Sequence, residues 1–338
     1  MSGGAIPYHL RSHKYVDRRL FVDLLSRFER WRSLDQYVYV SMGAYPLEDH
    51  KLVHRIVGMT RLIAFDMDED VVSRQEFNRP VESCVCLHKK SGEVVSEFQA
   101  ILADCGFGDA EGAVIWLDYT DPKKIGSQIR EFQSLLDKLR SGDVVRITVC
   151  AHPNEFMEPQ QGDVPLQKTE KMEKQFANLK KWIGDYLPSW ASADHMTIDG
   201  LPLVLSHSFS SAALKSFPAN GALTFSPLSV IRYADTTQML SFTGAIVEKK
   251  DESSMRDSIG LDRWPFSSPD WSRIHRLLVP VLTVRERLFL ERGILAKEGD
   301  ELISGLGFGR ASNVDMKDFI SSYKSYYRFY PTLLPSEV

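Results

Sequence analysis

The stretch Tyr37–Pro80 decides the fold, because it holds two apolar runs separated by a polar, helix-forming segment. The first run, Tyr37-Val38-Tyr39-Val40, leads into Ser41-Met42-Gly43-Ala44, and the second, Leu62-Ile63-Ala64-Phe65, ends at Asp66. Near-continuous apolar runs of this length are typical of parallel strands that are buried on both faces. A small residue after one strand and an acid at the tip of the next are the layout that a nucleoside-containing ligand needs, since backbone must approach the ligand and a carboxylate must hold ribose hydroxyls.

A third apolar run, Val114-Ile115-Trp116-Leu117, ends at Asp118. Parallel strands present their carboxyl ends at one edge of a sheet, and open α/β sheets bind ligands at that edge. We therefore expect Asp118 to join Asp66 and the Gly43 segment there.

Strand-like and helix-like segments alternate over the first 190 residues, which is typical of parallel strands joined by crossover helices. A helix over 15–33 comes first, because apolar residues recur there at helical spacing. Strands are predicted near 37–42, 62–66, 82–87, 112–118 and 143–150, with helices near 47–57, 69–78, 93–104 and 123–140. Leu223–Ala234 and Gln238–Val247 predict a closing antiparallel hairpin. The predicted fold class is α/β, with a doubly wound, mostly parallel, seven-stranded sheet.

These patterns divide the chain into three predicted parts. Residues 1–35 are expected to form an N-terminal basic helix or lid, 36–250 the α/β domain, and 251–338 a small C-terminal helical subdomain, with the charged segment Lys249–Ser254 as a linker. Helical patterns over 277–290, 300–306 and 315–327 support the last part. Aromatic residues near the end of the chain are expected to pack this subdomain onto the sheet, with a homodimer contact as the alternative.

Composition narrows the class of protein. The 338 residues are 43% hydrophobic and 25% charged, which is ordinary for a soluble globular protein. A net charge of −4 argues against a nucleic-acid binder over the whole surface. Because no apolar run approaches the roughly 18 residues of a membrane span and no leader opens the chain, we expect a cytoplasmic protein with no membrane partner. Cys84 and Cys86 are interpreted as buried thiols, since no second Cys or His pair follows at zinc-ligand spacing.

Several short phrases, together with the strand pattern, its two strand-end acids and the closing hairpin, resemble a known family. The phrases are Arg11-Ser12-His13-Lys14, Tyr39-Val40-Ser41-Met42-Gly43, Leu47-Glu48-Asp49, Arg74-Gln75-Glu76-Phe77-Asn78-Arg79-Pro80 and Trp116-Leu117-Asp118-Tyr119-Thr120-Asp121. They look like a bacterial family labelled putative O-methyltransferase, within the class I S-adenosylmethionine-dependent methyltransferases. The likeness covers most of the chain to about residue 250 and is weaker beyond it.

The resemblance implies a Rossmann-like methyltransferase fold with S-adenosylmethionine as its cofactor. The implied cofactor-binding residues are Ser41, Met42, Gly43 and Ala44 under the methionine part, Asp66 at the ribose and Met67 against the adenine. Asp118 and Tyr119 would face the methyl group and the substrate as catalytic residues. A metal site is not expected, because no Asp-Asn pair follows the fifth strand, where His152 and Asn154 are the nearest candidates.

The loop after the first strand departs from the usual pattern of this class, which carries two or three glycines. Gly43 stands alone and is followed by Ala44-Tyr45-Pro46. Tyr45 adds bulk and Pro46 removes a backbone donor where the carboxylate end of the cofactor is expected. A methyltransferase-like chain that no longer binds the cofactor is therefore an alternative interpretation.

Basic residues cluster at the start of the first predicted helix, among them Arg11, Lys14 and Arg18. The simplest interpretation is a solvated helix face. The functional interpretation is a lid or clamp in which these residues bind an anionic group of the substrate. Contact with nucleic-acid phosphates is a further, less favoured interpretation.

The leading hypothesis is a methyltransferase acting on an oxygen or nitrogen of a small-molecule or nucleotide-like substrate. The alternative, motivated by the glycine-poor loop, is a catalytically inactive, methyltransferase-like binding or sensor subunit of a multi-protein bacterial system. A dinucleotide-dependent oxidoreductase is disfavoured, since Gly43 lacks the companion glycines that let a pyrophosphate approach the backbone.

Overall fold

The structure is a computed structural model of the chain, and it describes residues 11–158, 166–234, 236–308, 310–311 and 314–331. Its centre is an eight-stranded sheet in the order β3-β2-β1-β4-β5-β7-β6-β8. The strands are β1 (Tyr37–Ser41), β2 (Arg61–Asp66), β3 (Cys84–His88), β4 (Gly112–Asp118), β5 (Val144–Cys150), β6 (Leu223–Ala234), β7 (Gln238–Glu248) and β8 (His275–Arg276). Strands β1 to β5 are parallel, and β7 runs antiparallel to both β5 and β6. The predicted α/β class with a mostly parallel sheet and a closing hairpin is confirmed, and the two-residue β8 adds an eighth strand beside β6.

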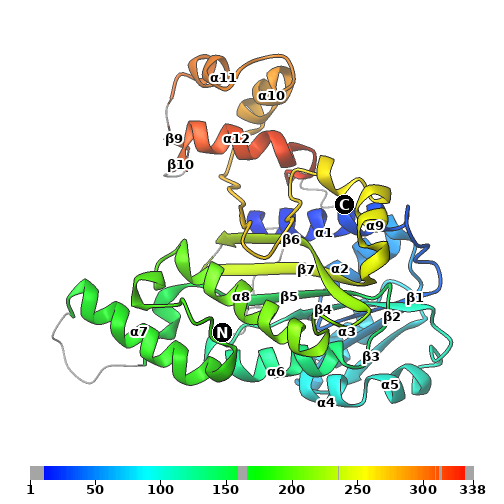
Figure 1. Cartoon of the computed structure of the whole chain (residues 1–338). Coiled ribbons are helices and arrows are strands. Elements are labelled where there is room, and N and C mark those ends of the chain that lie inside the picture. The colour runs from blue at the N-terminus through cyan, green and yellow to red at the C-terminus, as the bar shows by residue number, and fades with distance from the viewer. Residues whose placement is uncertain (1–10, 159–165, 235, 309, 312–313, 332–338) are drawn as a thin grey trace.

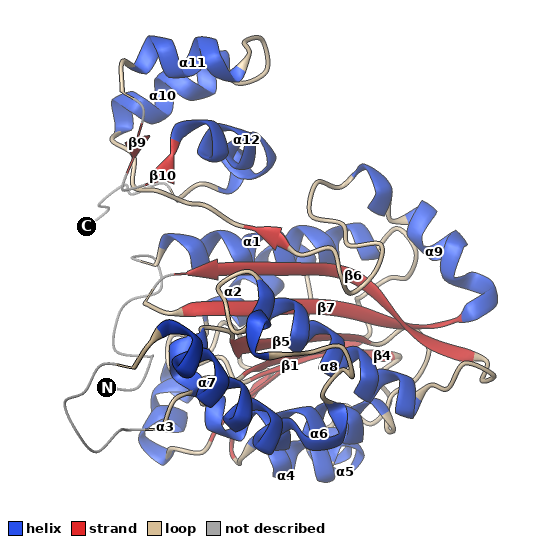
Figure 2. Ribbon diagram, turned by 60° about the vertical axis from the view of Figure 1, so that its left-hand side comes forward, coloured by secondary structure: helices blue, strands red, loops and turns tan. Residues whose placement is uncertain are grey.

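Helices cover both faces of the sheet, so the domain has three layers (Figure 1). The helices up to β6 are α1 (Ser12–Phe28), α2 (Glu48–Leu52) with its π-helical continuation η2 (Val53–Val57), α3 (Glu69–Asn78), α4 (Ser91–Ser96), α5 (Phe98–Asp104), α6 (Ile125–Leu136), α7 (Lys168–Ile183) and α8 (Gly200–Ser216). Helix α1 lies on one face, and α4, α6 and α8 lie on the other (Figure 2).

The two faces follow from the two-residue period of the strands. Tyr39 and Trp116 belong to the apolar cluster that includes α1, whereas Val40 and Leu117 belong to the cluster that includes α6 and α8. Asp118 continues the Trp116 side of β4, so its side chain emerges on the face that α1 covers.

Two expectations for the C-terminal part are wrong. The segment expected as a linker, Lys249–Ser254, forms a 3₁₀ turn and the start of α9 (Glu252–Ser258). The helix expected over 277–290 begins only at Val284, because Pro280 lacks a backbone donor and Thr283 caps the new helix with its side chain. The remaining elements are α10 (Val284–Gly293), α11 (Gly299–Leu306), β9 (Arg310–Ala311), β10 (Val314–Asp315) and α12 (Met316–Tyr326).

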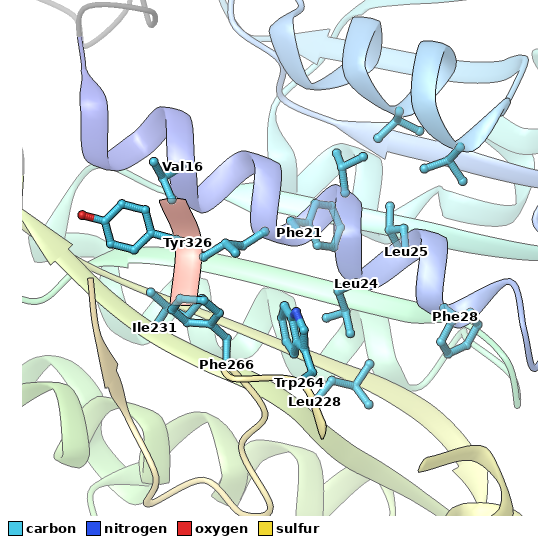
Figure 3. Close-up of a cluster of buried hydrophobic side chains, with 14 of the residues drawn as sticks. Val16, Phe21, Leu24, Leu25, Phe28, Leu228, Ile231, Trp264, Phe266 and Tyr326 are labelled. Atoms are coloured by element: carbon cyan, nitrogen blue, oxygen red, sulfur yellow. The ribbon is translucent and has the colours of Figure 1, made fainter. Parts of the chain in front are cut away.

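Helix α1 is buried between the sheet and the C-terminal segment (Figure 3). Its apolar side packs on β6 and on aromatic side chains that follow β7. The residues labelled in the figure are Val16, Phe21, Leu24, Leu25, Phe28, Leu228, Ile231, Trp264, Phe266 and Tyr326. The division of the chain at residues 35 and 250 stays a prediction.

Candidate functional site

The carboxyl ends of β1, β2 and β4 bring Ser41, Asp66 and Asp118 to one edge of the sheet. Ser41, the last residue of β1, is the register partner of Ala64 on one side and of Trp116 on the other. Asp66 and Asp118 each lie two residues beyond these partners. The Gly43 loop is therefore flanked by a carboxylate on both sides, as the sequence predicted.

The backbone of this loop is strained. Gly43 has φ +65°, and the non-glycine residues Ala44 and Leu47 have φ +45° and +52°. The Ala44 N–H donates to the Met42 carbonyl at 2.7 Å, which closes a tight three-residue turn around Gly43. Positive φ at a residue with a side chain costs of order 1–3 kcal/mol, and such residues cluster at ligand sites and switches. The strain at Ala44 and Leu47 therefore marks the loop as a candidate ligand-binding segment.

Helix α3 holds the loop from one side. The Gln75 amide nitrogen donates to the carbonyls of Met42 at 3.0 Å and Ala44 at 3.3 Å, and Asn78 donates to the Tyr45 carbonyl at 3.1 Å. The Arg74 guanidinium lies 3.5 Å from the centre of the Tyr45 ring. The bulk that replaces a second glycine is thus packed against α3.

A buried polar network supports the loop from α2. Asp49 Oδ2 accepts hydrogen bonds from the Tyr39 hydroxyl at 2.7 Å and the Ser41 hydroxyl at 2.6 Å, and Asp49 Oδ1 faces His50 Nδ1 at 3.3 Å. His50 Nε2 lies 3.1 Å from the Ile63 carbonyl. Both ring nitrogens of His50 face acceptors, so the doubly protonated, cationic ring satisfies both contacts.

The electrostatics of this network agree with a charged pair. Burial alone would raise the pKa of Asp49, but the charge of His50 and the hydrogen bonds from His50 and Ser41 hold it well below its ordinary value. Burial alone would lower the pKa of His50, but the Asp49 carboxylate raises it above its ordinary value of 6.5. From sequence alone, Asp49 and Gln75 stood only within family-like phrases and His50 was missed. The available signal for the Asp49–His50 pair was a polar stretch in a helix that had to be buried between two strands.

Asp66 and Met67 lie at the tip of β2. Asp66 Oδ1 accepts the Asp68 N–H at 2.9 Å, and burial raises the pKa of the Asp66 carboxyl. The Met67 side chain is exposed. The backbone carbonyl oxygen of Met67 lies 3.0 Å from His88 Nε2. An acid beside an exposed apolar side chain is compatible with ribose and adenine, the parts predicted for these positions.

Asp118 meets the basic start of α1. Asp118 Oδ2 forms an ion pair with Lys14 Nζ at 2.7 Å, and both side chains are largely buried. Asp118 Oδ1 is buried and has no hydrogen-bond partner among the described residues. A buried, unpaired carboxylate oxygen is costly, so this atom is a candidate contact for a donor on a ligand.

The other predicted basic residues share this side of α1. Arg18 is buried, with its guanidinium 6.0 Å from the centre of the Trp116 ring, and Arg11 precedes the first turn of the helix and is half-buried. Because Arg11, Lys14 and Arg18 are spaced three and four residues apart, they lie on one face of the helix.

Tyr119 directly follows Asp118 in the chain, but the two side chains emerge on opposite faces of the sheet. Its side chain is buried in the apolar cluster on the opposite face of the sheet, and its hydroxyl donates to Glu131 Oε2 at 2.7 Å. Burial and the nearby Glu131 raise the pKa of Tyr119 well above its ordinary value. Tyr119 therefore does not share the face of β4 that presents Asp118.

Comparison with known proteins assigns the family. A family model described as "Putative O-methyltransferase" matches residues 6–338. The chain belongs to this family. The match includes the C-terminal helices, where the resemblance in the sequence was weaker. The family description supports a methyltransferase and names neither the methyl donor nor the molecule that accepts the methyl group. No curated protein matches the chain.

Two further features bear on the kind of protein. No helix in the described part of the chain has the length and apolar character needed to cross a bilayer. Within the same residues, no three His, Cys, Asp or Glu side chains converge in a way that could hold a metal ion.

Proposed function

We propose that this family member transfers a methyl group from S-adenosylmethionine to a hydroxyl oxygen of a small or nucleotide-like acceptor. Asp118 carries the proposal: Oδ2 is held by Lys14, while Oδ1 is buried without a partner in the described residues, at the edge where open α/β sheets bind ligands. Asp118 Oδ1 could accept a hydrogen bond from the hydroxyl group of the methyl acceptor. The word O-methyltransferase in the family description favours oxygen over nitrogen as the acceptor atom.

The residues at the ends of β1 and β2 fit an adenosyl ligand. The turn around Gly43 is partly exposed and lies between two strand-end acids. Ser41, Met42, Gly43 and Ala44 would hold the methionine part, Asp66 the ribose hydroxyls, and the exposed Met67 one face of the adenine. When bound, S-adenosylmethionine would supply an electrophilic methyl group on a positively charged sulfur.

Asp118 would orient the acceptor hydroxyl and take up its proton. The role needs a carboxylate within hydrogen-bond reach of the hydroxyl, with its second oxygen already held so that the group keeps one orientation. Lys14 supplies that second contact. Arg11 and Arg18, on the same side of α1, would bind an anionic group of the acceptor, since a guanidinium pairs well with carboxylate or phosphate.

Calorimetry with S-adenosylmethionine and its demethylated product tests the donor directly. We expect the wild-type protein to bind both, and Asp66→Asn to weaken binding by about tenfold or more, as expected for the loss of a charged hydrogen-bond acceptor. Asp70→Asn is the matched control, because Asp70 is an exposed acid in the first turn of α3. A wild-type protein that binds neither compound at millimolar concentration would overturn the proposal and favour the inactive binding subunit.

A further inference from the structure

The loop after β1 keeps a strained shape although it lacks the glycines that usually make such a shape inexpensive. Ala44 and Leu47 carry side chains at positive φ, so the surrounding structure must hold them there. The contacts that hold them include the Gln75 and Asn78 amides from α3 and the Asp49–His50 pair from α2.

We propose that Gln75 is a positioning residue for the cofactor, which acts by locking the Met42–Leu47 loop in its ligand-binding conformation. The inference rests on the proposed function, because it assigns the loop to S-adenosylmethionine. Gln75 touches the loop backbone only, so its effect on a ligand is indirect.

The geometry of Gln75 explains why an amide is needed. Its single NH₂ group donates to two carbonyls, those of Met42 and Ala44, which are the two ends of the turn around Gly43. The Met42 carbonyl also accepts the Ala44 N–H, so the amide braces the same bond that closes the turn. A carboxylate in this place would face two acceptors, and an apolar side chain would leave both carbonyls without this donor.

The buried position of Gln75 lowers the stability of the fold, which indicates that its side chain has a role in holding the loop. Gln75 is fully buried, and its Oε1 has no hydrogen-bond partner within the described part of the chain. A buried acceptor without a partner destabilises the fold. The amide is therefore oriented for the loop even though its own oxygen is left unsatisfied.

On the side of the loop that faces α2, Leu47, Asp49 and His50 hold the turn independently of Gln75. A Cβ on Gly43 would lie 2.7 Å from Leu47 Cδ2 and 2.8 Å from His50 Cε1, so the turn rests directly on these side chains. Ser41 Oγ accepts the Gly43 N–H at 3.3 Å and itself donates to Asp49. Because these contacts do not involve Gln75, its replacement should loosen the turn at Met42–Ala44 and leave the contacts with α2 in place.

The test compares Gln75→Met with Gln238→Met. Gln238 is a matched control, because its buried amide also donates to two carbonyls, those of Ala151 at 2.9 Å and Ile198 at 2.8 Å, beside β5 and away from β1 and β2. Each variant loses two hydrogen bonds of the same kind, so both should lose similar stability. Only Q75M should increase the mobility of the Met42–Leu47 loop.

Three readouts are measured on the full chain. Hydrogen exchange of the Gly43 and Ala44 amides should become about fivefold to thirtyfold faster in Q75M, the range expected for one or two net hydrogen bonds, and should stay unchanged in Q238M. Calorimetry with the demethylated cofactor should show a loss of affinity of the same size in Q75M only. In turnover assays, KM for S-adenosylmethionine should rise while kcat changes little.

Asn78→Ala is a second variant in case Q75M does not fold. It removes one half-buried donor to the Tyr45 carbonyl and should give a smaller change in the same direction. Unchanged loop exchange in both variants, or faster exchange with unchanged cofactor affinity, would overturn the positioning role. If the wild type binds no S-adenosylmethionine, the proposed function and the cofactor part of this inference both fall, whereas faster exchange in Q75M alone would still show that Gln75 holds the loop.

Discussion

Lys14 Nζ lies 2.7 Å from Asp118 Oδ2, and this ion pair joins the first helix to the tip of the fourth strand across 104 residues. The pair is largely shielded from water, so its orientation is better defined than that of an exposed pair. It gives the N-terminal helix a direct contact with the candidate catalytic carboxylate, in addition to the apolar packing of the same helix on β6.

Replacement of Asp118 by Asn should abolish most of the turnover and leave cofactor binding unchanged. A positioned general base contributes about 10²- to 10⁴-fold, so kcat should fall by that range in D118N. Lys14→Met should lower kcat less, because the carboxylate remains and loses only its partner. The measurement is methyl transfer under saturating cofactor, with calorimetry on the same samples. Wild-type turnover in D118N would remove Asp118 from the mechanism.

The buried pair of Arg146 and Asp17 should dominate the stability of the α1 contact. Their N–O distance is 2.5 Å, both side chains are almost fully buried, and Arg146 also donates to Thr243 at 3.0 Å. Removal of one partner from such a pair leaves an uncompensated buried charge, so Arg146→Met should lower the free energy of unfolding by about 3–5 kcal/mol in urea denaturation. The double variant Arg146→Met with Asp17→Leu should recover much of this loss.

An exposed pair gives the control for that experiment. Lys174 and Glu170 lie one helical turn apart on α7, 3.3 Å from each other, and each is half exposed. Lys174→Met should change the free energy of unfolding by no more than about 0.5 kcal/mol. Equal effects at the two sites would mean that burial does not set the strength of these pairs.

Much of the sheet follows from sequence, because each strand is a local pattern. The apolar runs place β1, β2 and β4, and the acids at two of their ends predict that Asp66 and Asp118 share an edge. Contacts between distant segments leave no local pattern, so the pairing of Lys14 with Asp118 and of Gln75 with the Met42 carbonyl had no signal in the chain. The prediction that Tyr119 faces the substrate was wrong for a different reason. Consecutive side chains of a strand emerge on opposite faces, so Tyr119 points away from the face that presents Asp118.

The stability of the fold should fall at alkaline pH through His50. The pKa of His50 is raised in the folded chain, so above pH about 6.5 the folded state keeps a proton that the unfolded state releases. The contribution of His50 is therefore fully present below about pH 6.5 and is lost as the pH rises through the folded pKa. The difference in free energy of unfolding between wild type and His50→Gln should be largest near about pH 6 and shrink above it.

Tyr39→Phe is the control for His50. It removes one donor to Asp49 without a change of charge, since the pKa of the buried Tyr39 hydroxyl lies well above its ordinary value. Its loss of stability, about 1.5–3 kcal/mol for a hydrogen bond to a charged group, should be the same across this pH range. A pH-independent effect of H50Q would argue that the ring is neutral in the folded state.

Tyr119→Phe separates the two faces of β4 in a single experiment. The Tyr119 hydroxyl donates to Glu131 on α6, on the face opposite to Asp118, so its loss should weaken the contact of α6 and leave the chemistry untouched. We expect the free energy of unfolding to fall by about 1.5–3 kcal/mol, as for other hydrogen bonds to a charged group, while kcat stays within about twofold of the wild type. Assays at a temperature well below the unfolding transition keep the two effects apart. A collapse of kcat in a stably folded Y119F protein would return Tyr119 to the active site and require β4 to present a different face to the substrate.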